Sequence, residues 1–247
     1  MNAIQYVRRL PLAGAPNTRD LGGYPCQGGM TRWGMFLRSA SPANFLPEDI
    51  EALKQYGLTA VVDLRSDDEC SRQPSKLLGV EGLKIHRIPL LDQINSANFE
   101  GDLPGSMSGL YISLLNKNGN DFVRIFEIFA EEEGCVLFNC TAGKDRTGMA
   151  AMLLLGLAGV NESDIEADYA MTEIYMAASF NNQKEELKKI GISQSVPEFV
   201  FRSMPESMRR TSRHLRENWG SAEGYLLDAG LPEETIERVK KKFVVPA

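Results

Sequence analysis

Cys140 and Arg146 are the two residues of this chain whose types and spacing most clearly indicate chemistry. A cysteine thiolate is a nucleophile, and an arginine can hold an oxyanion through two parallel hydrogen bonds. Five residues separate the two, between an apolar run that ends at Asn139 and an apolar segment that begins after Thr147. We therefore interpret residues 140–146 as a loop that joins a buried strand to the first turn of a helix.

A loop of this length can bind a tetrahedral dianion. Its backbone N–H groups can converge on one oxyanion, and the following helix adds partial positive charge at its N-terminus. This positive field favours the thiolate form of Cys140, and Gly143 suits a position where the backbone must approach the anion closely. The predicted chemistry is attack of Cys140 on phosphorus to form a phosphocysteine, which water then hydrolyses. The residues expected to bind the phosphate are Thr141, Ala142, Gly143, Lys144, Asp145 and Arg146.

The segment CTAGKDRTG, residues 140–148, resembles the Cys-x5-Arg signature of protein tyrosine phosphatases, in particular bacterial members of the tyrosine/lipid phosphatase group. Further segments occur in the order that this family leads one to expect: residues 17–23 (NTRDLGG), 38–40 (RSA), 62–65 (VDLR) with Glu69, and 225–230 (YLLDAG). The resemblance implies an α/β fold with a central, mainly parallel sheet flanked by helices and the catalytic loop between strand and helix. It also implies a dual-specificity-like hydrolase acting on phosphotyrosine and related phosphomonoesters.

One position departs from the pattern of this family. Asn139 stands immediately before the nucleophile, where the family usually has histidine. An asparagine can still hydrogen-bond and orient the loop, so we expect reduced rather than absent activity. Thr147 is expected to donate its hydroxyl to the thiolate or to help the phosphate depart. Asp63 and Arg65 are expected to brace the loop as charged supporting residues.

Two aspartates are candidates for the acid that protonates the leaving group. Asp145 lies in the loop itself, close to bound phosphate, where similar bacterial enzymes use the aspartate of a GKDR sequence. Asp92 follows the predicted strand at 83–90, where dual-specificity phosphatases usually carry their acid. The resemblance favours Asp145, and Asp92 is the alternative.

Two alternative functions use the same loop. A phosphoinositide phosphatase is one, because Lys144 adds a positive charge that could meet a second phosphate. A catalytically weak phosphate-binding module is the other, motivated by Asn139, although Cys140 and Arg146 are both present. A nucleotide-binding loop is excluded, because the glycine required at its start falls at Phe138.

The composition narrows the choice of partners. The formal net charge of −6 argues against broad nucleic-acid binding. No apolar run approaches the roughly 18 residues of a membrane span, so we expect no stable membrane insertion and a cytoplasmic protein. Four scattered cysteines and two histidines indicate neither a metal site nor a disulfide framework, and no cofactor is expected. The expected partners are a phosphotyrosine protein or phosphoinositide substrate, and a phosphate or sulfate ion in the loop.

Hydrophobic periodicity and turn residues predict one α/β domain, residues 1–247. A helical lid insertion is placed at about 180–220, where the basic amphipathic segment 202–216 either packs as a solvated helix or covers the pocket. Strands are expected at 35–37, 58–64, 83–90 and 135–139, and helices at 47–57, 110–115, 121–133, from 147 onward, 162–180, 182–190, 206–218, 222–228 and 232–243.

Overall fold

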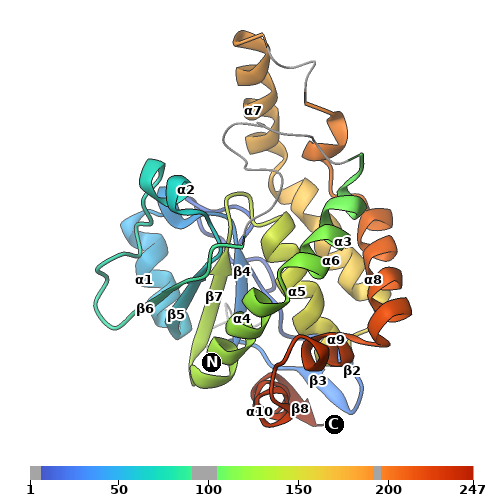
Figure 1. The fold of residues 1–247 in the computed structure, drawn as a ribbon. Helices are drawn as coiled ribbons and strands as arrows, with labels where there is room; N and C mark the ends of the chain where they lie inside the picture. The colour runs from blue at the N-terminus through green and yellow to red at the C-terminus, as the bar shows by residue number, and fades with distance from the viewer. Residues whose placement is uncertain (1–6, 91–104, 192–195, 247) are drawn as a thin grey trace.

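The computed structural model describes residues 7–90, 105–191 and 196–246. In its main sheet β4, β7, β5 and β6 run parallel, and β1 lies antiparallel at the edge beside β4 (Figure 1). The order β1–β4–β7–β5–β6 makes β7, the strand before Cys140, the central one. This architecture confirms the expected α/β class with a mainly parallel central sheet. The strands are β1 (Arg19–Asp20), β4 (Phe36–Ser39), β5 (Leu58–Asp63), β6 (Lys84–Arg87) and β7 (Cys135–Asn139).

The central strands bury side chains on both faces of the sheet. Val136 and Phe138 belong to one apolar layer, whereas Cys135 and Leu137 belong to another. Successive strand residues point to opposite faces, so a continuous apolar strand requires helices on both sides. The smaller layer includes Leu53 from α1 (Pro47–Tyr56). The larger layer is covered by α3 (Met107–Lys117), α4 (Gly119–Glu131), α5 (Asp145–Leu157), α6 (Glu162–Tyr175), α8 (Pro205–Trp219), α9 (Ala222–Asp228) and α10 (Glu233–Phe243).

A second, small sheet ties the C-terminal segment to the N-terminal part of the chain. Its strands are β2 (Pro25–Cys26), β3 (Gly29–Thr31) and β8 (Val244–Pro246), all antiparallel. The sequence analysis predicted no strand at the C-terminal end. The pairing of β8 with β3 links segments far apart in the chain, so no local pattern marks it.

Two helical regions differ from expectation. The helix predicted at 162–180 is two helices, because the chain turns at Met176, which is buried in a small apolar cluster with Ala40 and Phe180. The helix that follows is α7 (Ala177–Lys189). A further short helix, α2 (Asp67–Arg72), was not predicted, although Ser66 and Glu69 form a capping box at its start.

The region predicted as a lid contains α7, a short 3₁₀ helix η4 (Glu198–Phe201) and α8. In Figure 1, α7 extends away from the sheet, whereas α8 packs against α3 and α6. Met208 and Leu215 form the buried face of α8, as its amphipathic pattern predicted, and Arg209 pairs with Glu166 on the outer face. Within the described residues, no helix is both long and apolar enough to cross a membrane.

Candidate active site

Three parallel strands bring polar residues to one edge of the sheet. Asn139, the last residue of β7, is in register with Ser39 of β4 and with Asp63 of β5. Cys140 follows directly and is buried. Since ligand sites of open α/β sheets form beyond the carboxyl ends of the strands, this edge is the expected place for a site.

The loop after Cys140 closes onto the start of α5. Lys144 is the residue before the helix, and Asp145 and Arg146 lie in its first turn, where backbone amides have no partner within the helix. Gly143 has a φ of 68°, and a Cβ at this position would lie 2.4 Å from the carbonyl oxygen of Ser39. The loop therefore needs glycine here, both for the backbone conformation and for the close approach to β4.

Carbonyl groups of the loop are bound by residues outside it. The Asn17 side-chain amide donates to the carbonyl of Ala142 at 2.9 Å and to that of Gly143 at 3.2 Å. Arg38 Nη2 donates to the Gly143 carbonyl at 2.8 Å, and the Ser41 N–H donates to the Thr141 carbonyl at 2.9 Å. Three successive carbonyls are thus held by the surrounding fold.

Arg38 is itself held by a buried charge cluster. Asp168 of α6 accepts from Arg38 Nη1 and, at 2.8 Å, from Arg19 Nε. All three side chains are almost completely buried. Burial raises the pKa of Asp168, but the charges of Arg19 and Arg38 outweigh it and hold that pKa at about 2. Asp168 is therefore ionised at neutral pH and fixes both guanidinium groups behind the loop.

Arg146 forms a two-pronged ion pair with Glu69. Its Nη1 and Nη2 atoms each lie 2.7 Å from one carboxylate oxygen. Thr141 Oγ1 also donates to this carboxylate, and the N–H of Ser66 donates to it at 2.8 Å as part of the cap of α2. The carboxylate thus joins α2, the first residue after Cys140 and the first turn of α5.

Asn139 connects the nucleophile to Asp63 and Arg65. Its side-chain amide donates to Asp63 Oδ1 at 3.1 Å, and Arg65 Nη2 donates to Asp63 Oδ2 at 2.7 Å. Arg65 also donates to the Ser41 hydroxyl at 2.9 Å, so the pair bridges β5 to the segment beside the loop. Thr147 is completely buried, and its hydroxyl has no hydrogen-bond partner among the described residues.

The structure describes one of the two candidate acids, Asp145. Asp145 Oδ1 accepts a hydrogen bond of 2.6 Å from the Tyr111 hydroxyl, and its side chain is 22% exposed. Asp92 lies outside the described residues. Only Asp145 can therefore be placed, at the N-terminus of α5 beside the loop.

Lys144 does not extend into solvent. It is almost completely buried, and its ammonium group donates to the carbonyl of Val200 and, at 3.2 Å, to that of Arg202. Its Nζ also lies 3.5 Å from Asp145 Oδ1. These contacts place the backbone of η4 and of the residue that follows it next to the loop.

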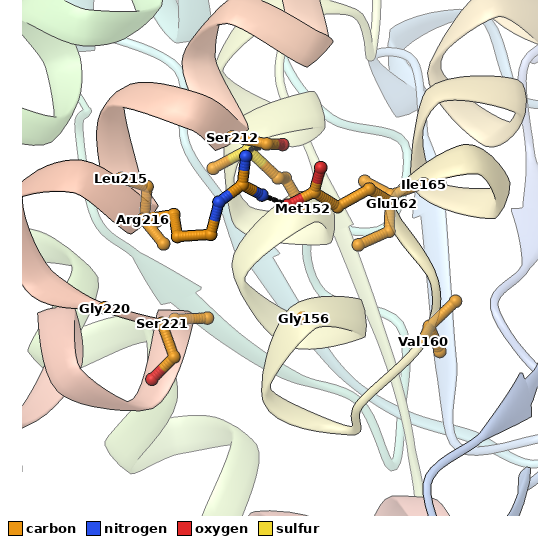
Figure 2. Close-up of a pocket in the computed structure, with 11 residues that line it drawn as sticks. Met152, Gly156, Val160, Glu162, Ile165, Ser212, Leu215, Arg216, Gly220 and Ser221 are labelled. Carbon is orange, nitrogen blue, oxygen red and sulfur yellow. Dashed lines mark hydrogen bonds and ion pairs between the residues drawn. The ribbon is translucent and has the colours of Figure 1, made fainter.

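A pocket elsewhere on α5 is separate from this site. Figure 2 shows it between α5, α6, α8 and the start of α9, with a volume of about 180 Å³. Its walls are largely apolar, and the one ion pair drawn across it joins Glu162 to Arg216. No residue of the loop from Cys140 to Arg146 lines it, and we assign it no part in the chemistry.

Several residues that hold the loop had no assigned role in the sequence analysis. Glu69 and Arg38 were noticed only as parts of segments shared with a family. The spacing of Ser66 and Glu69 is a capping-box signal that predicts the helix but not the ion pair with Arg146. Asp168 and Tyr111 carry no local signal, because their partners lie 130 and 34 residues away.

Comparison with known proteins agrees with this geometry. The tyrosine phosphatase family profile matches residues 10–245. A tyrosine-protein phosphatase of Nostoc commune is 31% identical over 217 residues, which cover 84% of this chain and 74% of the relative. The triple specificity protein phosphatase PtpB of Mycobacterium tuberculosis is 26% identical over 277 residues, covering 95% and 98%. A crystal structure of P. aeruginosa TpbA aligns with 79% of this chain and 86% of its own at a TM-score of 0.37 and 19% identity, too low to carry an argument.

A buried cysteine at the carboxyl end of the central strand is followed by a loop and a helix-borne arginine, which is the arrangement that the sequence analysis predicted for a phosphatase. The chain belongs to the tyrosine phosphatase family. This confirms both the resemblance and the enzyme class expected from the sequence.

Proposed function

We propose that the protein hydrolyses phosphotyrosine and related phosphomonoesters through a phosphocysteine at Cys140. The observation that carries the proposal is the outward anchoring of the loop: Asn17 and Arg38 bind the carbonyls of Ala142 and Gly143. With these carbonyls engaged, the N–H groups of the loop and of the first turn of α5 are available to a phosphate dianion. Cys140 at one end of the loop and Arg146 at the other then flank the phosphorus.

The reaction proceeds in two displacements. The Cys140 thiolate attacks phosphorus, the bond from phosphorus to the tyrosyl oxygen breaks, and Asp145 transfers its proton to that oxygen. Water then attacks the phosphocysteine and loses a proton to Asp145, and the thiolate leaves. A bound dianion favours the protonated form of a carboxyl group beside it, as an acid requires.

Replacement of the nucleophile tests the mechanism. Cys140→Ser should abolish turnover of a phosphotyrosine peptide while leaving phosphate binding intact, because the serine hydroxyl is far less acidic than the thiol. Cys26→Ser is the matched control, since Cys26 is another free cysteine but lies in the small sheet. Sustained turnover by Cys140→Ser at a rate near that of the control would rule out the phosphocysteine.

A phosphoinositide substrate is the second candidate, and the position of Lys144 bears on it. In the structure the ammonium group is engaged by the carbonyls of Val200 and Arg202. Lys144 must leave these carbonyls before it can meet a second phosphate, so the arrangement favours a substrate with one phosphate. Parallel assays on a phosphotyrosine peptide and on phosphoinositide vesicles, with wild type and Lys144→Met, distinguish the two classes. The phosphoinositide class is supported if Lys144→Met loses activity only on the vesicles.

We also propose that part of the region predicted as a lid at about 180–220, namely η4 and Phe180 of α7, covers the loop within a single domain. Ala142 packs against the apolar cluster that contains Phe180 and Phe201, so the loop and this segment share a contact surface. The cytoplasmic location and the binding of a phosphate or sulfate ion stay predictions.

A further inference from the structure

The described part of the chain contains one hydrogen-bonded path from the buried interior to Asp145. Tyr111 of α3 donates its hydroxyl to Asp145 Oδ1 at 2.6 Å. The Tyr169 hydroxyl of α6 lies 2.6 Å from that of Tyr111. Both tyrosines are almost completely buried, whereas the Asp145 side chain is partly exposed. The path therefore links the protein core to a group that opens toward the site.

We propose that Tyr111 is a positioning residue, which fixes the side chain of Asp145 so that its second oxygen carries the transferred proton. The proposal rests on the assignment of Asp145 as general acid made above.

The direction of each hydrogen bond follows from counting hydrogens. A tyrosine hydroxyl has one hydrogen, and Tyr111 uses it on Asp145 Oδ1. Tyr169 must then be the donor in its contact with Tyr111. Burial and the neighbouring carboxylate raise the pKa of Tyr111 well above its ordinary value of 10.0, so Tyr111 remains a donor throughout the physiological range of pH.

The two oxygens of Asp145 are consequently unequal. Oδ1 accepts from Tyr111 and also lies 3.5 Å from Lys144 Nζ. Oδ2 has no hydrogen-bond partner among the residues that the structure describes. A carboxyl proton resides more favourably on the oxygen that does not already accept hydrogen bonds, so the acidic proton belongs on Oδ2.

The packing around the tyrosines holds this arrangement in place. The rings of Tyr111 and Tyr169 meet edge to face, with centroids 5.8 Å apart. Gly148 of α5 lies directly against Tyr169, since a Cβ at this position would be in van der Waals contact with Tyr169 Cδ2 at 3.4 Å. Three helices thus fix one rotamer of Asp145, which reduces the entropy lost when the acid is aligned with the leaving oxygen.

Tyr111→Phe tests the proposal, because it removes the hydroxyl and keeps the ring. We expect kcat to fall about tenfold for phosphotyrosine peptide, whose leaving group needs a proton, a loss equivalent to one hydrogen bond between neutral groups. For an activated nitrophenyl phosphate, kcat should change by less than about twofold, because an acid matters little when the leaving group departs easily. KM should be unchanged for both substrates.

A double-mutant cycle distinguishes positioning from a general structural effect. Adding Tyr111→Phe to Asp145→Asn should cause no further loss, because the group that Tyr111 positions can no longer donate a proton. Tyr225→Phe is the matched control: Tyr225 is also buried, its hydroxyl donates to the Leu115 carbonyl at 2.8 Å, and it lies on α9 away from the loop. The control should lose comparable thermal stability without discriminating between the two substrates.

The three ways in which the proposal can fail give different kinetic results. Equal losses on both substrates, additive with Asp145→Asn, would show that Tyr111 only stabilises the fold and would overturn the inference. If Asp145→Asn discriminates between the substrates but Tyr111→Phe does not, the inference fails while Asp145 remains the acid. If Asp145→Asn lowers kcat equally for both substrates, Asp145 is not the general acid, and the inference about Tyr111 fails with it. The Cys140→Ser variant still tests separately whether a phosphocysteine forms.

Discussion

Glu69→Gln measures how much the buried ion pair with Arg146 contributes to the site. The substitution preserves the shape of the side chain, and glutamine can still serve in the capping box of α2. It replaces one charged oxygen with a neutral one and the other with an amino group that faces the guanidinium. Hydrogen bonds to charged groups contribute about 1.5–3 kcal/mol each, whereas a neutral one contributes about 1 kcal/mol.

The expected loss follows from the two 2.7 Å contacts between Arg146 and the carboxylate. One contact is weakened and the other is lost, which gives about 3 kcal/mol, at the lower end of the range for breaking a buried ion pair. The side chains of Arg146 and Glu69 are only 5% and 6% exposed, so solvent cannot compensate. We expect the free energy of unfolding in urea to fall by this amount, and kcat/KM for phosphotyrosine peptide to fall at least tenfold as Arg146 loses its orientation.

Glu166→Gln is the control for this measurement. Arg209 contacts Glu166 with a similar fork, at 3.1 and 2.7 Å, but the arginine side chain is 49% exposed. Water and salt screen this pair from the arginine side, although the Glu166 side chain is only 11% exposed. Its loss should therefore shift the urea midpoint less than Glu69→Gln does and should leave turnover unchanged. If the two variants lose the same stability, or if Glu69→Gln retains full activity, burial does not strengthen the Arg146 pair and Glu69 does not orient the clamp.

Three further predictions concern the loop and its supports. Asn139→His should increase turnover and the rate of iodoacetamide alkylation at Cys140 at fixed pH, because an imidazolium beside Asp63 adds positive charge near the thiolate; an unchanged rate would show that asparagine already performs this role. Gly143→Ala should abolish phosphatase activity, since the added Cβ would meet the Ser39 carbonyl at 2.4 Å. Gly34 has a similarly unfavourable φ of 75° but no atom within 4 Å of an added Cβ, so Gly34→Ala should lose stability only. Asp168 has a folded pKa of about 2, below its ordinary 3.8, so its stabilisation of about 2 kcal/mol is complete above pH 3.8 and is lost as the pH falls toward 2. Carbon NMR of the Asp168 carboxyl should show no titration between pH 5 and 3, and a midpoint near 4 would contradict the buried arginine cluster.

Much of the fold could be predicted because its elements carry local signals. The apolar residues 135–139 and the apolar segment after Thr147 predicted the central strand and the buried helix around Cys140, as observed in β7 and α5. The predicted helix at 222–228 coincides with α9. The missed elements depend on distant contacts or short signals: β8 pairs with a strand more than 200 residues earlier, and α2 is one short helix after a capping box.

In the candidate site, too, some features carry a local sequence signal and others depend on distant contacts. The spacing from Cys140 to Arg146 predicted a phosphate loop, and the structure places Asn139, Asp63 and Arg65 in one hydrogen-bonded chain beside it. Lys144 differs from the simple expectation of an open positive charge, because carbonyls of η4 and of the residue after it accept its hydrogen bonds. The sequence left Asp145 and Asp92 as rival acids, and the structure describes only the surroundings of Asp145.

By itself, the sequence determined the family, because the shared segments occur in the expected order along the chain. It also predicted the nucleophile and the arginine, because both lie within the single motif at residues 140–148. Only the tertiary structure showed that Glu69 holds Arg146, that Asp168 holds Arg38 behind the loop and that Tyr111 holds Asp145. These partners come from α2, α6 and α3, which the sheet and its helices bring together around the end of β7. Local spacing encodes a loop, whereas the orientation of its charged groups depends on buried hydrogen bonds that exist only after the chain has folded.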